Sequence, residues 1–258
     1  EEEKIGSYLE FKENILPRIK KLGYNTIQFM AIAEHVYYGS FGYHVTNYFA
    51  PSHWFGSPDD LKDLINTAHD MGFNVIMDVV HSHASKNVNE GINLFDTSPY
   101  QFFYEDERGD HPVWDSKCFD YNKNGVLKFL LSNLRFWMEE YHFDGFRFDG
   151  VTSMIYQNHG LGSNFTSYDD YFSMNTNLDA LTYLQLANQL IKEINPRALS
   201  IAEDVSGMPG LCLAIEDGGI GFDYRFAMGI APFWIENLKT PDEYWDLNAM
   251  WFELTTKR

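Results

Sequence analysis

The chain has 258 residues, of which 45% are hydrophobic, and its formal net charge is −18 at pH 7. This hydrophobic content allows a buried core and excludes a disordered polypeptide, and the length fits one α/β barrel or two small domains. The negative charge argues against nucleic acid and anionic membranes as partners, and no apolar run approaches the ~18 residues that would indicate a membrane-spanning helix.

Short β-rich runs alternate with helical patterns along the chain, which is typical of βα units around a parallel sheet. The run SPDDLKDLINTAHDMG predicts a helix over 57–72, because Ser57 can cap its first turn and Gly72 can end it. The remaining predicted elements are two helices, over 124–142 and 179–196, and five strands, near 26–32, 74–80, 145–149, 199–203 and 222–228.

The stretch 81–123 is polar and aromatic and has little periodicity, so we expect a long loop insertion there. A loop of this length after a strand in a compact domain is usually functional. Aromatic residues make up 17% of the whole chain. Such rings can stack on the apolar faces of sugars, but they are also ordinary core material, and their abundance alone favours the core.

Charged side chains gather where three successive predicted strands end. In a parallel α/β barrel these ends meet at one rim, which is where the chemistry occurs. Pairing of Arg147 with one acid for purely structural reasons is an alternative that the sequence leaves open. The side chains at the rim are Asp78, His81 and His83 after the first of the three strands, Arg147 and Asp149 after the second, and Glu203 and Asp204 after the third.

Glycosidic bond cleavage needs two carboxyl groups in opposite protonation states about an anomeric carbon. Asp149 suits the ionised nucleophile, because Arg147 beside it would lower its pKa. Glu203 suits the proton donor if it is partly desolvated and lies near the charge of Asp149. A separation of about 5–5.5 Å between the two carboxyl groups would imply retention of configuration. Asp204 points to the opposite face of its strand and is expected to be structural.

Three motifs in this order, DVVHSH (78–83), GFRFDGVTSM (145–154) and AEDVSGMP (202–209), resemble those of the α-amylase superfamily. The flanking runs MAIAEHVYYGSFGYHVTNYFAP (30–51) and GGIGFDYRFAMGI (218–230) are most similar to eukaryotic-type 1,4-α-glucan (glycogen or starch) branching enzymes. The resemblance covers nearly the whole chain and implies an α/β fold, a partial TIM (β/α)8 barrel.

The same resemblance implies roles for individual residues. For Tyr43, the alternative to a role in sugar binding is packing within its own loop. His81 has no matched role and is expected to be a satisfied or exposed histidine. The implied site consists of Asp149 as nucleophile, Glu203 as general acid/base, Arg147 holding Asp149 in position, Asp78 and His83 contacting the reacting sugar, and Tyr43 stacking on it.

No metal site and no cofactor are expected. Ser82 stands where many amylases have an Asn that helps to bind calcium, and the reaction needs neither a metal nor an organic cofactor. The family also has a third carboxylate in a His-Asp pair after its seventh strand. The single such pair here, His69-Asp70, lies within a predicted helix. The resemblance therefore implies that residues 1–258 are the central part of the catalytic barrel, strands two to six, with the first strand before Glu1 and the last two beyond Arg258.

The implied activity is a glycosyltransferase that cleaves α-1,4 linkages and forms α-1,6 branches in an α-glucan (glycogen, amylose or amylopectin) by a retaining double displacement. One alternative is a hydrolase of the amylase or debranching type, and another is a non-catalytic glucan-binding homologue. The isolated segment is expected to be inactive. Cys118 and Cys212 form no disulfide framework, which favours a reducing compartment. The expected location is the cytoplasm, or a plastid for a starch enzyme of a plant or alga.

Overall fold

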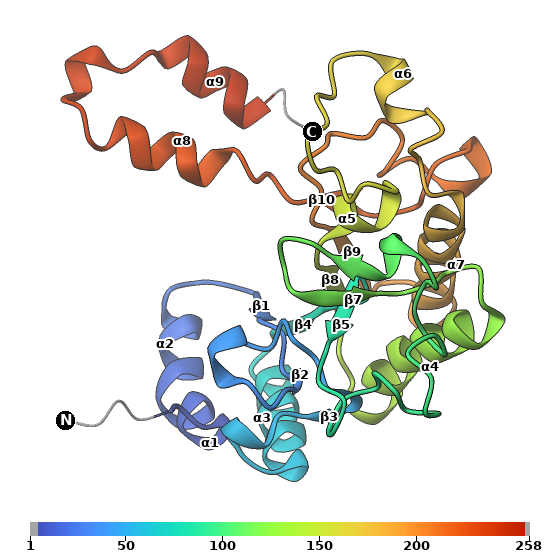
Figure 1. Cartoon of the computed structure of the whole chain (residues 1–258). Coiled ribbons are helices and arrows are strands. Elements are labelled where there is room, and N and C mark those ends of the chain that lie inside the picture. Colours follow the sequence, from blue (N-terminus) through green and yellow to red (C-terminus); the bar gives the residue numbers. More distant parts are fainter. Residues whose placement is uncertain (1–4, 256–258) are drawn as a thin grey trace.

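A computed structural model describes residues 5–255, and its centre is a five-stranded sheet (Figure 1). The strand order is β1-β4-β8-β9-β10, and every neighbouring pair is parallel. Each strand lies within one of the five predicted ranges, so the predicted parallel sheet is confirmed. The strands are β1 (Thr26–Phe29), β4 (Asn74–Val79), β8 (Gly145–Phe148), β9 (Leu199–Ala202) and β10 (Tyr224–Arg225).

Three long helices connect these strands: α3 (Pro58–Asp70), α4 (Asn124–Glu140) and α7 (Leu178–Ile194). All three were predicted from helical periodicity. Ser57 caps α3 as expected: its side chain accepts from the backbone N–H of Asp60, whose carboxylate accepts in turn from the N–H of Ser57. The buried faces of these helices and the strands β4 and β8, which are buried except for Asn74, form the core. Trp137, Phe146 and Phe148 are completely enclosed there.

The stretch 81–123 is more ordered than the sequence indicated. It contains a three-stranded antiparallel sheet of order β5-β7-β6, made of β5 (His83–Ser85), β6 (Asp110–His111) and β7 (Ser116–Cys118). Strands of two or three residues are too short to show alternation of polar and apolar side chains, so the sequence pattern missed them. This small sheet lies beside the carboxyl end of β4 (Figure 1).

Several further elements were not predicted. The last two helices form an arm that projects from the rest of the structure, orange to red in Figure 1. Over residues 5–255 no helix is both long and apolar enough to span a membrane. The unpredicted elements are α1 (Tyr8–Glu10), η1 (Phe11–Ile15), α2 (Leu16–Lys21), β2 (Ala33–Glu34), β3 (Asn47–Pro51), α5 (Val151–Ile155), α6 (Tyr168–Tyr171), α8 (Ile230–Asn237), α9 (Leu247–Thr255) and five one-turn helices.

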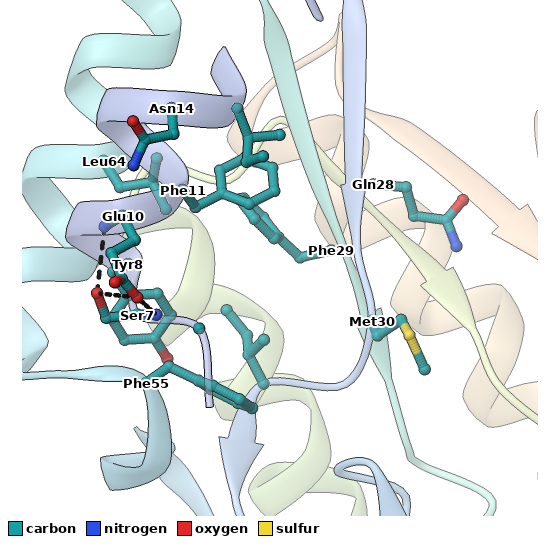
Figure 2. Close-up of a pocket in the computed structure, with 13 residues that line it drawn as sticks. Ser7, Tyr8, Glu10, Phe11, Asn14, Gln28, Phe29, Met30, Phe55 and Leu64 are labelled. Carbon is teal, nitrogen blue, oxygen red and sulfur yellow. Dashed lines mark hydrogen bonds between the residues drawn. The ribbon is translucent and has the colours of Figure 1, made fainter. Parts of the chain in front are cut away.

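The two outer strands of the main sheet are β1 and β10. A cavity of about 530 Å³ lies beside β1, and Figure 2 shows that it is bounded by apolar side chains of η1, β1 and α3. Phe11 and Phe29 pack against each other there with ring centroids 5.2 Å apart. Here an apolar face borders an unpaired sheet edge, an arrangement that can accept a further packed element.

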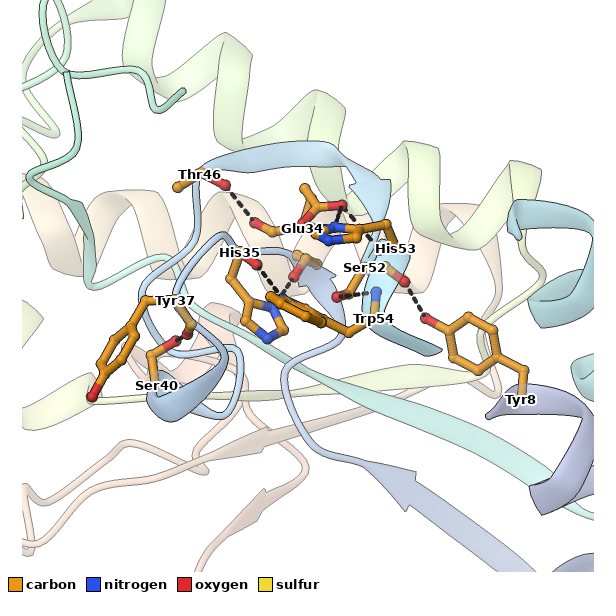
Figure 3. A network of polar contacts seen from close by, with 10 residues as sticks. Tyr8, Glu34, His35, Tyr37, Ser40, Thr46, Ser52, His53 and Trp54 are labelled. Atoms are coloured by element: carbon orange, nitrogen blue, oxygen red, sulfur yellow. Dashed lines mark hydrogen bonds and ion pairs between the residues drawn. The ribbon is translucent and has the colours of Figure 1, made fainter. Parts of the chain in front are cut away.

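The segment after β1 is fixed by polar contacts that surround β2 and β3 (Figure 3). Glu34 accepts hydrogen bonds from the backbone N–H of His53 over 3.0 Å and from its Nδ1 over 2.9 Å. Trp54 Nε1 donates to the carbonyl oxygen of His35 over 2.9 Å. These bonds hold the start of a loop that carries Tyr37 and Tyr43 to the carboxyl end of the sheet.

Candidate active site

Arg147 lies at the centre of the carboxyl end of the sheet, on β8. Its Nη1 donates to Asp78 Oδ2 over 2.6 Å and to Asp149 Oδ1 over 3.1 Å, and its Nη2 lies 2.9 Å from Glu203 Oε2. Asp78 is the direct neighbour of Arg147 in the parallel pairing of β4 and β8. One guanidinium therefore joins acids from three strands. A purely structural ion pair would need only one of these acids.

Asp149 and Glu203 both line a cleft of about 630 Å³ above Arg147. Both carboxyl groups contact the same guanidinium, and the negative charge of Glu203 acts on Asp149, so the two acids lie near each other. The backbone N–H of Gly150 also donates to Glu203 Oε2, over 2.9 Å. The fold thus brings these two predicted acids together in one cleft.

The predicted protonation of Asp149 is wrong for this structure. Burial, and secondly the negative charge of Glu203, raise the pKa of Asp149 to about 7. Arg147 acts in the opposite direction, but its effect is smaller than the sum of these two. At a pH below about 7, Asp149 therefore carries a proton.

Asp78 is only 2% exposed and does not line the cleft. Beyond the bond from Arg147, it accepts hydrogen bonds of 2.7 Å from Gln28 Nε2 and of 2.7 Å from the hydroxyl of Tyr43. Burial raises the pKa of Asp78. Asp78 thus holds Arg147 and Tyr43 in position, and its contact with a sugar stays a prediction.

Tyr43 and His83 line the cleft together. His83 Nε2 donates to the carbonyl oxygen of Tyr43 over 2.7 Å, so its Nδ1 accepts from the Ser82 hydroxyl over 2.8 Å. Burial lowers the pKa of His83 to about 3, which keeps the ring neutral. Both ring nitrogens are already paired, so His83 sets the position of Tyr43 and offers the cleft its ring. Stacking of a sugar on Tyr43 stays a prediction.

The two residues expected to lie outside the chemistry do so. His81 is buried and bonded at both nitrogens, to the Tyr183 hydroxyl over 2.5 Å and to Asn133 Oδ1 over 2.8 Å. Asp204 is also buried, and its oxygens accept from the Thr152 hydroxyl and from backbone N–H groups of its own loop, including that of Gly207. Both are satisfied structural groups, as predicted.

Sequence reasoning missed several residues of the cleft wall, among them Tyr37, Trp114, His159 and Leu161. Trp114 belongs to the stretch 81–123, whose length and aromatic content were the signal that could have identified it. Within residues 5–255, no group of three or more His, Cys, Asp or Glu side chains is arranged to hold a metal ion. The prediction that the protein uses no metal or cofactor stays a prediction.

Comparisons with known proteins agree with this geometry. The family model described as alpha amylase, catalytic domain, matches residues 13–119. A protein of Yarrowia lipolytica named 1,4-alpha-glucan-branching enzyme is 56% identical over 269 residues, which cover 100% of this chain and 39% of that protein. The chain belongs to the branching-enzyme family of the α-amylase superfamily. A second relative, the 1,4-alpha-glucan-branching enzyme 2-2, chloroplastic/amyloplastic, of Arabidopsis thaliana, is 54% identical over 98% of this chain and 32% of its own length.

This member of the branching-enzyme family spans less than half the length of these two curated relatives. Among solved structures, an α-amylase of Geobacillus thermoleovorans complexed with acarbose matches with a TM-score of 0.65 and 20% identity, over 89% of this chain and 48% of that one. A maltogenic α-amylase of Thermotoga neapolitana matches with a TM-score of 0.56 and 22% identity, over 76% of this chain and 41% of that one. These similarities show the fold, and the predicted partial (β/α)8 barrel is confirmed.

Proposed function

We propose that these residues are the central part of the catalytic barrel of a 1,4-α-glucan-branching enzyme acting on glycogen, amylose or amylopectin. The observation that supports this most directly is that Asp149 and Glu203 line one cleft and that Arg147 bridges both. The identity of 56% across the whole chain to a relative that bears this name supports transfer over hydrolysis. No nucleic acid and no membrane are expected as partners.

In the proposed reaction, Glu203 protonates the glycosidic oxygen while the Asp149 carboxylate attacks the anomeric carbon. The bond between that carbon and the leaving oxygen breaks, and a glycosyl ester forms on Asp149. Glu203, now ionised, accepts the proton of a 6-hydroxyl on a second glucan chain. That oxygen attacks the anomeric carbon, the ester bond breaks, and an α-1,6 branch forms with retained configuration.

This sequence of steps requires the proton to lie on Glu203 when the sugar is bound. In the free protein the proton lies on Asp149 below about pH 7, because burial and the charge of Glu203 raise its pKa. Both side chains contact the Arg147 guanidinium in the same cleft, which places the two acids near each other. We propose that a glucan entering the cleft separates the acids and leaves the proton on Glu203, so that Arg147 then stabilises the ionised Asp149.

Incubation of the native-length protein with amylose tests this proposal. The expected result is new α-1,6 linkages, counted by the NMR signal of their anomeric protons, with little release of reducing ends. Reducing ends without branches would instead identify a hydrolase, and binding of amylose with neither product would identify a non-catalytic homologue. The variants Asp149→Asn and Glu203→Gln serve as controls, each expected to lower kcat by ~10⁴-fold or more.

We propose the cytoplasm as the location, or a plastid if the source stores starch. Cys118 and Cys212 are both free thiols, which suits a reducing compartment. The Arabidopsis relative bears the name chloroplastic/amyloplastic. Fractionation of source cells with an antibody to the protein separates the two locations, and recovery in a secreted fraction would contradict both.

A further inference from the structure

Trp114 lies beside the proposed nucleophile. Its partly exposed ring lines the same cleft as Asp149 and Glu203. A Cβ atom built on Gly150, the residue directly after Asp149, would come within 3.0 Å of Trp114 Cη2. The indole edge is therefore in close contact with the backbone that carries the nucleophile. A sugar whose anomeric carbon faces Asp149 would lie next to the indole.

The orientation of this ring is fixed from several sides. The imidazole of His111 stacks on it with ring centroids 3.9 Å apart and planes within 6° of parallel, and the His83 ring lies 5.0 Å away. His111 Nδ1 accepts a hydrogen bond of 3.1 Å from the backbone N–H of Trp114, and the Trp114 carbonyl contacts His44 Nε2 over 3.1 Å. The ring is thus held in place before any ligand binds, which lowers the entropic cost of binding.

His111 has no other evident role at the cleft. It is almost completely buried, at the end of β6, and does not itself line the cleft. Because Nδ1 is an acceptor, the proton of the neutral ring lies on Nε2, which has no hydrogen-bond partner among the described residues. Burial and the neighbouring His159 lower the pKa of His111 to about 4, so it presents a neutral flat ring to the indole.

The chemistry of the cleft wall fits a carbohydrate. A glucosyl unit has apolar C–H faces that pack on flat rings and hydroxyl groups that need polar partners. Trp114 supplies a rigid flat surface, and Ser153 and His159 lie in the lining of the same cleft. Trp114 is distinct from Tyr43, whose hydroxyl is bonded to Asp78 and whose carbonyl is bonded to His83.

We propose that Trp114 is a binding platform for a glucosyl unit adjoining the one that reacts, and that His111 is the positioning residue that sets the plane of the indole. This inference rests on the proposed function for the identity of the ligand, an α-1,4-glucan. Loss of the Trp114 platform weakens binding of the glucan, while Asp149, Glu203 and Arg147 are unchanged.

Calorimetric titration with maltoheptaose tests the platform in the native-length protein, with Glu203→Gln in the background to prevent turnover. Trp114→Ala should weaken binding about tenfold, and Trp114→Phe, which keeps a flat ring, by no more than about threefold. Phe95→Ala is the matched control: Phe95 is 72% exposed on the same stretch of chain but does not line the cleft, so binding should not change. Equal affinity of the Trp114→Ala and control variants would overturn the proposal.

Thermal unfolding of each variant shows whether it is folded. If Trp114→Ala unfolds, Trp114→Leu takes its place, because leucine keeps apolar volume and removes the flat ring. For His111→Gln with Glu203 intact, the expected result is a KM for amylose raised several-fold with kcat nearly unchanged. A fall in kcat and in Tm with an unchanged KM would show that His111 only supports the fold.

The failure of this inference is distinguishable from failure of the proposed function. Wild-type protein that binds maltoheptaose but forms no branches would refute branching, and the Trp114 variants would still decide the platform. Wild-type protein that forms branches while Trp114→Ala binds and reacts normally would refute the platform alone. Absence of maltoheptaose binding by a wild-type protein that also forms no branches from amylose would refute both.

Discussion

Gly150 donates its backbone N–H to Glu203 Oε2 over 2.9 Å while adopting a left-handed conformation, with φ at 63°. The residue after the proposed nucleophile thus also positions the proposed acid/base. A side chain at this position would be strained by its φ angle, and its Cβ would meet Ser82 Oγ at 2.9 Å and Trp114 at 3.0 Å. Glycine at this position therefore allows the arrangement of both acids and the close approach of the indole.

The variant Gly150→Ala should therefore lose activity without losing the fold. We expect kcat to fall by ~10- to 100-fold and the free energy of unfolding by ~1–2 kcal/mol, the cost of a left-handed non-glycine residue plus local crowding. Kinetics on amylose and urea denaturation measure the two quantities. Gly162→Ala is the control, because Gly162 also has a positive φ but has open space around its Cβ position. Full activity of Gly150→Ala would contradict the requirement for glycine at this position.

Replacement of Arg147 by Lys should impair catalysis even though the charge is kept. The guanidinium reaches Asp78, Asp149 and Glu203 at once, and a single ammonium group lacks the planar fork that allows this. We expect kcat to fall by ~10²-fold or more while KM changes little. Arg135→Lys is the matched control, since the pair of Arg135 with Glu139 is exposed and should contribute little.

The stability of the protein should depend on pH through Asp149. Its pKa is raised to about 7 from an ordinary value of 3.8, so the folded state binds this proton more tightly than the unfolded state. The resulting stabilisation is fully present below about pH 3.8 and is lost as pH rises through about 7. The free energy of unfolding of the wild type relative to Asp149→Asn should thus decrease between pH 5 and pH 8. A difference that stays constant, or one that increases with pH, would show that Asp149 is not protonated in the folded state.

The 258-residue segment, produced alone, should be inactive and should aggregate. Its sheet has two outer strands, β1 and β10, and the arm formed by α8 and α9 exposes large apolar side chains, with Leu247 71% and Trp251 70% exposed. Size-exclusion chromatography with light scattering measures the association. A monomeric segment that forms branches would contradict the proposal that these residues are only the central part of a catalytic barrel.

The sequence was sufficient to bring Arg147, Asp149 and Glu203 together, because parallel strands end at one edge of a sheet and side chains alternate along each strand. It was not sufficient to locate the proton. The pKa of Asp149 depends on burial by residues distant in the chain, and a motif carries no information about that burial. The proximity of Arg147 alone gave the wrong direction.

The same limit applies to the walls of the cleft. The burial of Asp78 beneath Tyr43 depends on a loop that is fixed through β2 and β3, two short strands without a clear pattern. Trp114 reaches the cleft through the turn between β6 and β7, which have two and three residues. Long helices such as α3 were predictable from periodicity and caps, whereas these short paired strands depend on contacts with the rest of the fold.

Arg147 and the three acids that it joins also determine the electrostatic potential in the cleft. Three carboxyl groups surround one guanidinium, so acids outnumber the cation at the floor of the cleft. Such a floor attracts a sugar ring whose anomeric carbon becomes electron-poor as its bond breaks. It should therefore also discriminate among inhibitors, because a ring with a protonated nitrogen in place of the ring oxygen gains an attraction that its uncharged counterpart lacks.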